Sequence, residues 1–334
     1  MNKCKYSYRK ELYIYMKIKR IIGIILTGIM AFNFISCNNV AENSNNDNSS
    51  TIETQNSSIT FTDDLGNEIT VKSPKHVAIA SESLANAYML AGGTISLTTE
   101  DAIKSNKLNL PEGIENMGSL KTPSVEKILS SDIDLVIFSG TISTQVKLKD
   151  QLNDAKIPTA YFNIEYFEDY ERMMKIFTDI TGRKDLYEKN VEQVKSQIDN
   201  QKKKATAEKP SVLLLRAYSK GVTAKGSDSM TGAMLKDLGC INVADDKNAF
   251  GELSMEAIIN ADPDYIFVTT MGESDEAAMA SLYNMFTSNP AWNNLKAVKE
   301  KHYHILDKEL FHNKPNEKWG KSYEILADIL YPQK

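Results

Sequence analysis

The stretch SVEKILSSDIDLVIF at residues 124–138 returns 130 residues later as SMEAIINADPDYIFV at residues 254–268. Of the fifteen aligned positions, five are identical and six more pair one apolar residue with another. In each copy a helical period of apolar residues leads through Asp-x-Asp into an apolar run too short for a helix, which is typical of a strand buried on both faces. The repeat therefore predicts an α/β fold of two similar lobes, each a three-layer αβα sandwich around a parallel-dominated sheet.

Each copy begins with a serine that can cap the helix after it. We expect the apolar residues at i, i+3 and i+4 of these helices to face a core, namely Val125, Ile128 and Leu129, and Met255, Ile258 and Ile259. Glu126 and Glu256 follow the first apolar residue of each helix and lie about 100° round it, so they should point toward water. The sequence thus predicts two exposed first-turn carboxylates, one in each lobe.

The chain as a whole, with 42% hydrophobic and 25% charged residues, has a composition ordinary for a globular protein, but its first 36 residues differ in kind from the remainder. A basic start leads into an apolar run at residues 21–35, which is shorter than the roughly 20 residues that span a bilayer. This order, ending in FISC, predicts a lipoprotein signal peptide at 1–36 and a lipid on Cys37. An uncleaved anchor is the alternative. In either case we expect the globular part on the extracytoplasmic face of the cell membrane.

Removing residues 1–36 takes away seven Lys and Arg and one acidic residue, which leaves a net charge of −11. That charge disfavours nucleic acid as a partner and suits a protein with a basic face. Of the three cysteines only Cys37 and Cys240 remain, and a lipidated Cys37 leaves Cys240 without a partner, so we expect no disulfide. Residues 37–58 are nearly all polar, which predicts a disordered tether.

Strands and helices then alternate in the same order twice, so we expect an N-terminal lobe at 59–184 and a C-terminal lobe at 208–334. Residues 185–207, between them, contain no Gly or Pro and many Glu, Lys and Gln. We interpret this segment as one bridging helix about 34 Å long, with a ligand cleft between the lobes that it joins. A solvated helix inside one lobe is the alternative.

This organisation resembles the substrate-binding lipoproteins of ABC importers, of the class that serves iron-siderophores, haem and cobalamin. The resemblance runs from about residue 59 to 334 and rests on FTDDLGNEITV, NMGSLKTPSVEKILSSDIDLVI, ITGR, LSMEAIINADPDYIFV, NPAWNNLKAVKEKHYHIL and LADILYP. It implies a monomeric binding protein, without catalysis or an intrinsic cofactor, that carries a ferric siderophore, haem or a corrinoid. It also implies docking on a permease driven by an ATPase, through one surface glutamate of each lobe. Glu126 and Glu256 match those two residues.

Ligands of open α/β sheets bind beyond the carboxyl ends of the strands, which we expect at residues 81–83, 139–141, 163–165, 216–218, 269–271 and 308–312. Arg216 is the sharpest candidate, because a guanidinium directly after an apolar run is costly to bury unless it pairs with an anion. A structural salt bridge is the alternative. The remaining candidates are Ser81 and Ser139, Tyr218 and Phe311 for stacking on a flat ligand, and Met271 and His312 as axial ligands of haem.

Two other classes of function compete with this interpretation. Direct capture of zinc or manganese would need several His and carboxylates from both lobes, whereas the chain has four His, of which His302 and His304 share one strand face. Catalysis finds little support, because GSDSM at Gly226 lacks the Gly-x-Ser-x-Gly spacing and Cys240 has no evident His partner. We therefore expect binding rather than chemistry, and no metal site built by the chain itself.

Overall fold

The computed structural model of the protein describes residues 58–272 and 274–332. The predicted signal peptide, Cys37 and the tether lie outside these residues, except for Ser58, which is the first residue of strand β1 and pairs with Lys72. No helix in the described part of the chain combines the length and apolarity that crossing a membrane requires.

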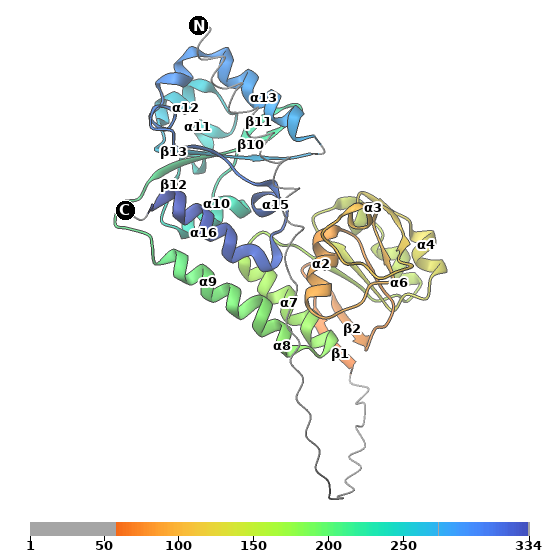
Figure 1. Ribbon diagram of the computed structural model, residues 1–334. Helices are drawn as coiled ribbons and strands as arrows, with labels where there is room; N and C mark the ends of the chain where they lie inside the picture. Colours follow the sequence, from red (N-terminus) through yellow and green to blue (C-terminus); the bar gives the residue numbers. More distant parts are fainter. Residues whose placement is uncertain (1–57, 273, 333–334) are drawn as a thin grey trace, which may run out of the picture. The chain divides into compact units, whose positions relative to one another are not determined.

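The N-lobe, from β1 to α7, is built on a parallel sheet of order β5-β4-β3-β8-β9 (Figure 1). Its sheet strands are β3 (Val77–Ile79), β4 (Leu97–Thr98), β5 (Glu115–Asn116), β8 (Leu135–Ser139) and β9 (Thr159–Phe162). Two antiparallel pairs accompany the sheet: β1 (Ser58–Thr62) with β2 (Glu68–Lys72), and β6 (Gly118–Ser119) with β7 (Thr122–Pro123). The helices are α2 (Glu82–Leu90), α3 (Glu100–Lys104), α4 (Val125–Ser130), α5 (Ser143–Val146), α6 (Lys149–Asp154) and α7 (Phe167–Thr181).

Helices cover both faces of this sheet. Ile137 of β8 packs in one hydrophobic cluster with residues of α2 and α7, whereas its neighbour Val136 packs in a second cluster with Ile128 of α4 and Leu152 of α6. Successive strand residues point to opposite faces, so the continuous apolar run in the sequence feeds two cores. The lobe is therefore a three-layer sandwich.

The C-lobe, from β10 to α16, repeats this plan around β10 (Ser211–Tyr218). Its other strands are β11 (Gly221–Ala224), β12 (Ile241–Asn242), β13 (Tyr265–Thr270) and β14 (Tyr303–Ile305). The α-helices are α10 (Met230–Asp237), α11 (Lys247–Phe250), α12 (Met255–Ala261), α13 (Asp275–Ser288), α14 (Lys296–Lys299), α15 (Lys308–Phe311) and α16 (Trp319–Leu330), with 3₁₀ turns at Val243–Asp245, Pro290–Asn294 and Asn316–Lys318.

The two sheets share one topology, which confirms the predicted fold class. In the N-lobe β3 has β4 on one side and β8 then β9 on the other, all parallel. In the C-lobe β10 has β12 on one side and β13 then β14 on the other, again all parallel. Within the described residues, the C-lobe sheet departs from the parallel pattern at β11, which pairs antiparallel with β10.

The repeated helices α4 and α12 are capped as predicted but less buried than predicted. Ser124 Oγ accepts a hydrogen bond from the Lys127 N–H, and Ser254 Oγ accepts one from the Ala257 N–H. Ile128 and Ile258 are fully buried, but Leu129 is 48% exposed, so its predicted place in the core is wrong. Because α4 is only six residues long, it turns one narrow face to the sheet, and the residue after Ile128 lies about 100° round from that face.

The bridging segment is helical from α8 (Lys184–Tyr187) through a π turn (Glu188–Glu192) to α9 (Gln193–Lys202) (Figure 1). The π turn contains buried Asn190, whose side-chain amide donates a hydrogen bond to the Leu90 carbonyl and whose backbone carbonyl accepts one from the Tyr170 hydroxyl. One end of the segment contacts α7 and the other packs along α16. The helix ends at Lys202 rather than at 207, because the N–H groups of Lys204 and Ala205 bond carbonyls three residues back and close the last turn.

Candidate functional site

A cleft with a volume of about 780 Å³ lies between residues of the two lobes. Its lining comes chiefly from segments that follow strand ends: residues 81–84 after β3, Ser139 at the end of β8, Ile164 and Glu165 after β9, Gly272 after β13, and residues 312–318 beyond β14 and α15. This is the edge at which open α/β sheets bind ligands. The volume is in the range of pockets that enclose small organic molecules.

The predicted candidates separate into two groups. Ser81, Ser139, Arg216 and His312 line the cleft. The lining does not include the other three: Tyr218 packs near Gly221 of the β10–β11 hairpin, Met271 is 37% exposed, and Phe311 is 1% exposed within the hydrophobic core. Phe311 and His312 are neighbours at the end of α15, so the helix turns one of them inward and the other toward the cleft.

Two cleft residues hold unusual backbone conformations. Ser81 is almost buried, has a φ of 136°, and caps α2 by accepting a hydrogen bond from the Leu84 N–H. Asn316 is 3% exposed, has a φ of 51°, and donates its amide hydrogens to the Ser83 carbonyl and to Asn86 Oδ1. Positive φ values are costly for residues other than glycine and gather at functional sites. Asn316 also ties the C-lobe side of the cleft to α2.

Two residues of the cleft lining each carry a buried side-chain nitrogen. Arg216 Nε and His312 Nδ1 are buried and make no hydrogen bond within the described structure. Burial lowers the pKa of the Arg216 guanidinium, an effect that the Glu165 carboxylate partly offsets. Burial, followed by the positive charges of Arg216, Lys308 and Lys314, lowers the pKa of His312 to about 4, so its imidazole is neutral near pH 7. These groups can donate to, or accept from, a bound molecule without breaking an existing bond.

Lys314 and Glu165 form a contact that the sequence did not predict. Lys314 Nζ lies 3.4 Å from Glu165 Oε1, which joins the two lobes at the cleft. Burial lowers the pKa of Lys314, and Glu165 opposes that shift. Glu165 falls within a predicted strand end, but Lys314 sits in an irregular loop after α15, where no periodicity or motif marks it. A second ion pair between the lobes joins Lys107 to Glu309. Lys107 Nζ also lies 3.6 Å from Glu82 Oε1.

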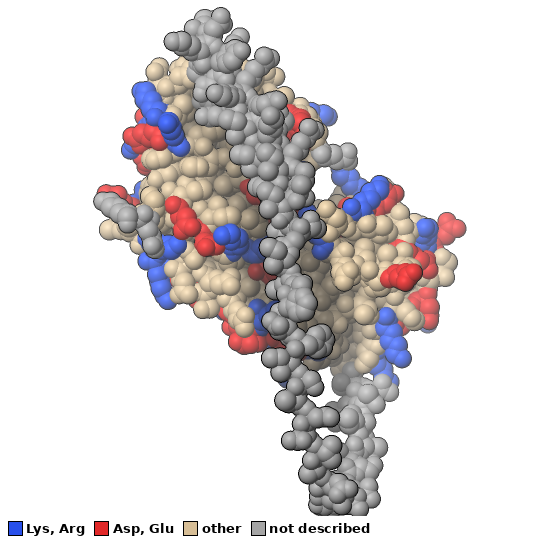
Figure 2. Space-filling model, viewed as in Figure 1, with Lys and Arg blue, Asp and Glu red and all other residues tan. Residues whose placement is uncertain are grey.

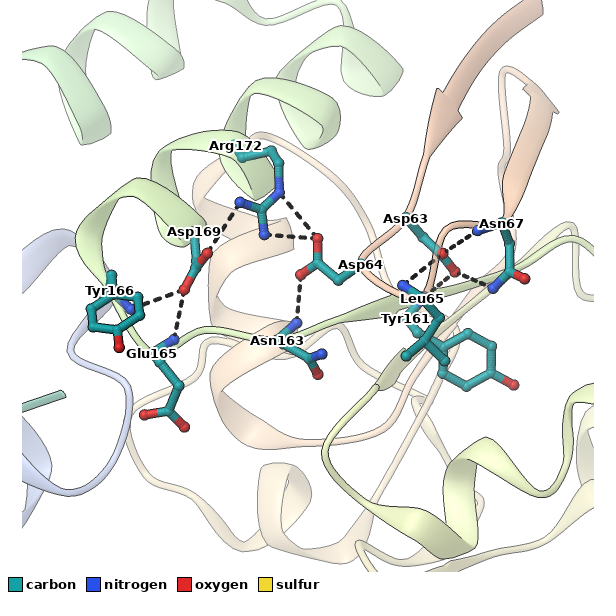
Figure 3. Close-up of polar contacts among 10 residues, drawn as sticks. All are labelled: Asp63, Asp64, Leu65, Asn67, Tyr161, Asn163, Glu165, Tyr166, Asp169 and Arg172. Carbon is teal, nitrogen blue, oxygen red and sulfur yellow. Dashed lines mark hydrogen bonds and ion pairs between the residues drawn. The ribbon is translucent and has the colours of Figure 1, made fainter. Parts of the chain in front are cut away.

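The segment that carries Glu165 is held by a network of aspartates (Figure 3). Asp63, in the turn after β1, accepts the Tyr161 N–H of β9 at 3.0 Å, and Asp64 accepts the Asn163 N–H at 2.6 Å. Asp169 of α7 accepts the N–H groups of Glu165 and Tyr166, both at 3.0 Å.

Arg172 joins the two halves of this network. It donates two hydrogen bonds to Asp64, at 3.0 and 2.7 Å, and one to Asp169 at 3.1 Å (Figure 3). The turn DDLGN thus helps to fix the backbone that carries Glu165, a residue of the cleft lining.

Glu126 and Glu256 are both exposed, each in the first turn of its helix. Figure 2 shows acidic and basic side chains interspersed over the visible face of the protein.

The histidines considered for a metal site lie elsewhere. His302 stacks on Tyr265, with ring centroids 4.3 Å apart, and His304 lies near Phe267 at 5.6 Å. Neither lines the cleft. Among residues 58–272 and 274–332, no three His, Cys, Asp or Glu side chains come together in a group that could hold a metal ion.

Comparisons with known proteins show which family and which solved structures this chain resembles. The sequence profile of the family described as periplasmic binding protein matches residues 77–310. The probable siderophore-binding lipoprotein YfiY of Bacillus subtilis is 24% identical over 310 residues, which cover 86% of this chain and 91% of that protein. The crystal structure of the petrobactin-binding protein YclQ of Bacillus subtilis superposes with a TM-score of 0.62 at 22% identity, over 83% of this chain and all of that one. The crystal structure of IsdE of S. aureus, complexed with heme, superposes with a TM-score of 0.62 at 18% identity, over 77% of this chain and 99% of that one.

Proposed function

This chain belongs to the periplasmic binding protein family, and from that premise we propose that it captures an iron complex outside the cell and delivers it to an ABC permease. Relatives named for siderophore and petrobactin binding support an iron complex as the ligand. We further propose that the protein is a monomer held on the membrane by a lipid on Cys37, and that Glu126 and Glu256 dock on the permease.

The observation that supports this function best is the pair of unpartnered buried nitrogens in the cleft. Arg216 Nε and His312 Nδ1 leave hydrogen-bonding capacity open, beside the charges of Lys308 and Lys314. Ferric siderophores present carboxylate, catecholate or hydroxamate oxygens to their surroundings, which such a site can bind. The free protein carries the cost of burying Arg216, and an anionic ligand would offset that cost.

Haem is the second candidate, favoured by one observation. His312 lines the cleft with a neutral imidazole, which is the form that ligates haem iron. The absorbance spectrum of protein purified from its native host separates the two ligands. A broad visible charge-transfer band indicates a ferric siderophore, and a Soret band indicates haem.

Titration with ferric complexes, followed by calorimetry, tests the proposal directly. We expect Arg216→Gln to weaken binding of an anionic ferric complex about tenfold or more, the loss of one charge-assisted contact. The same substitution should leave the free protein as stable as the wild type or more stable, because it removes a buried charge. The proposed function would be overturned if the wild-type protein bound no ferric complex of any class and no haem.

A further inference from the structure

Glu165 is the carboxylate that offsets the two cations at the centre of the cleft. It pairs with Lys314 at 3.4 Å, and in the described structure it is the acidic group whose charge acts on Arg216. Its side chain is 45% exposed and Lys314 is 28% exposed. Glu165 therefore stands where a bound molecule in the cleft would meet both cations, on the N-lobe side of the gap.

Among the other acidic side chains of the cleft lining, Asp101 accepts the Glu82 N–H with one oxygen and leaves the other without a partner in the described structure, whereas the rest pair with lysines. Glu82 and Glu309 share Lys107, Asp228 lies 3.5 Å from Lys247, and Glu317 lies 3.8 Å from Lys318. Lys308 lies 3.5 Å from Asp275 and donates to the Gly272 carbonyl. Glu165 is therefore the carboxylate that acts on both Arg216 and Lys314, while Asp169 also acts on Lys314.

Hydrogen bonds to aspartates hold the backbone of Glu165 in place. Its backbone N–H and those of Asn163 and Tyr166 are bound by Asp64 and Asp169, which Arg172 links (Figure 3). Each of these bonds is charge-assisted, the stronger class of hydrogen bond. These bonds hold the backbone from which the Glu165 side chain reaches Lys314.

We propose that Glu165 is a specificity-determining residue, which sets how much negative charge the cleft accepts on an iron complex. This inference rests on the proposed function. Near Arg216 and Lys314, an anionic complex gains attraction from both cations but meets repulsion from Glu165. A neutral complex experiences little of either. Glu165 therefore restrains binding of strongly anionic complexes relative to neutral ones.

The test compares Glu165→Gln with the wild type, using a trianionic ferric tris-catecholate and a neutral ferric tris-hydroxamate as probes. A charge that acts across several ångströms in a partly buried site is worth about tenfold in affinity. We expect the variant to bind the catecholate complex about tenfold more tightly, with the hydroxamate affinity changed less than about twofold. Raising the salt concentration should shrink the gain.

Asp228→Asn is the matched control, because it removes the same charge from the cleft lining at a site that Lys247 already compensates. Equal gains in Asp228→Asn and Glu165→Gln would overturn the inference in favour of a simple net-charge effect. An unchanged ratio of the two affinities in Glu165→Gln would overturn it as well. Binding of neither complex by the wild type would overturn the inference, whereas the proposed function would fall only if the wild type bound no ferric complex of any class and no haem.

Should Glu165→Gln fold poorly, Lys314→Gln tests the same balance from the other side. Removing this cation should weaken binding of the catecholate complex about tenfold and leave hydroxamate binding unchanged. Equal losses for the two complexes would refute the charge argument. Circular dichroism of each variant identifies any loss of fold before binding is measured.

Discussion

Replacing Arg172 with Met would remove the link between Asp64 and Asp169 while keeping an apolar stem of similar length. Asp64 is only 7% exposed at its side chain, so the substitution strands a buried carboxylate beside a second one that is 21% exposed. Removing one partner of a buried ion pair costs about 3–5 kcal/mol. Because the guanidinium is itself 45% exposed, solvent screening reduces this figure to about 2 kcal/mol. That loss lowers the unfolding midpoint temperature by about 5 °C.

The same helix offers a matched control. Lys175 pairs with Asp179 at 2.5 Å, one turn further along α7, but this pair is largely exposed. Lys175→Met should therefore cost less than about 0.5 kcal/mol, the usual value of a helical surface pair. Urea unfolding of both variants at pH 7 measures the two free energies of unfolding.

A double-mutant cycle identifies the cause of the loss. In Arg172→Met combined with Asp64→Asn, the carboxamide can still accept the Asn163 N–H, but no buried charge is left behind. We expect this double variant to recover part of the lost stability. If Arg172→Met is no less stable than Lys175→Met, the argument that Asp64 and Arg172 hold the segment at residues 163–166 is refuted.

Two further predictions concern docking and pH. Changing both Glu126 and Glu256 to Ala should abolish uptake of the iron complex while leaving its affinity for the isolated protein intact; wild-type uptake by the double variant would exclude these residues as the docking contacts. His312 in the folded protein has its pKa lowered to about 4, against about 6.5 when unfolded, so the unfolded chain binds a proton first as the pH falls. Stability should therefore decrease between about pH 6.5 and 4, and His312→Gln should flatten that decrease in urea unfolding; an identical slope in the variant would contradict the assignment.

The part of the cleft that could be predicted follows from strand order. Parallel strands end at one edge of a sheet, so the ends of β3 and β8 had to converge in the N-lobe, and Ser81 and Ser139 do. Arg216, near the end of β10, lines the same cleft from the C-lobe. Which residue at a strand end faces the cleft depends on the conformation of the loop. Ser81 shows this with its φ of 136°, and Phe311 shows it by turning into the core beside His312. No sequence period encodes such choices.

Leu129 shows the same limit for helices. Its spacing from Ile128 and Val125 satisfies the rule for an amphipathic helix, but a helix of six residues has too little length for its whole apolar face to be covered. Burial is decided by what packs opposite a residue, and that partner is distant in sequence. The exposed position of Glu126 was predictable because it requires no partner.

Local order in the chain was enough to establish duplication, alternating strands and helices, capped repeat helices and the strand ends that line the cleft, because each follows from short-range spacing and hydrogen bonding. The charge balance of the cleft came from the tertiary structure alone. Lys314 meets Glu165 at a sequence separation of 149, and Arg172 reaches Asp64 at a separation of 108. Electrostatic interactions depend on separation in space and on burial, and neither is written in the spacing of residues along the chain.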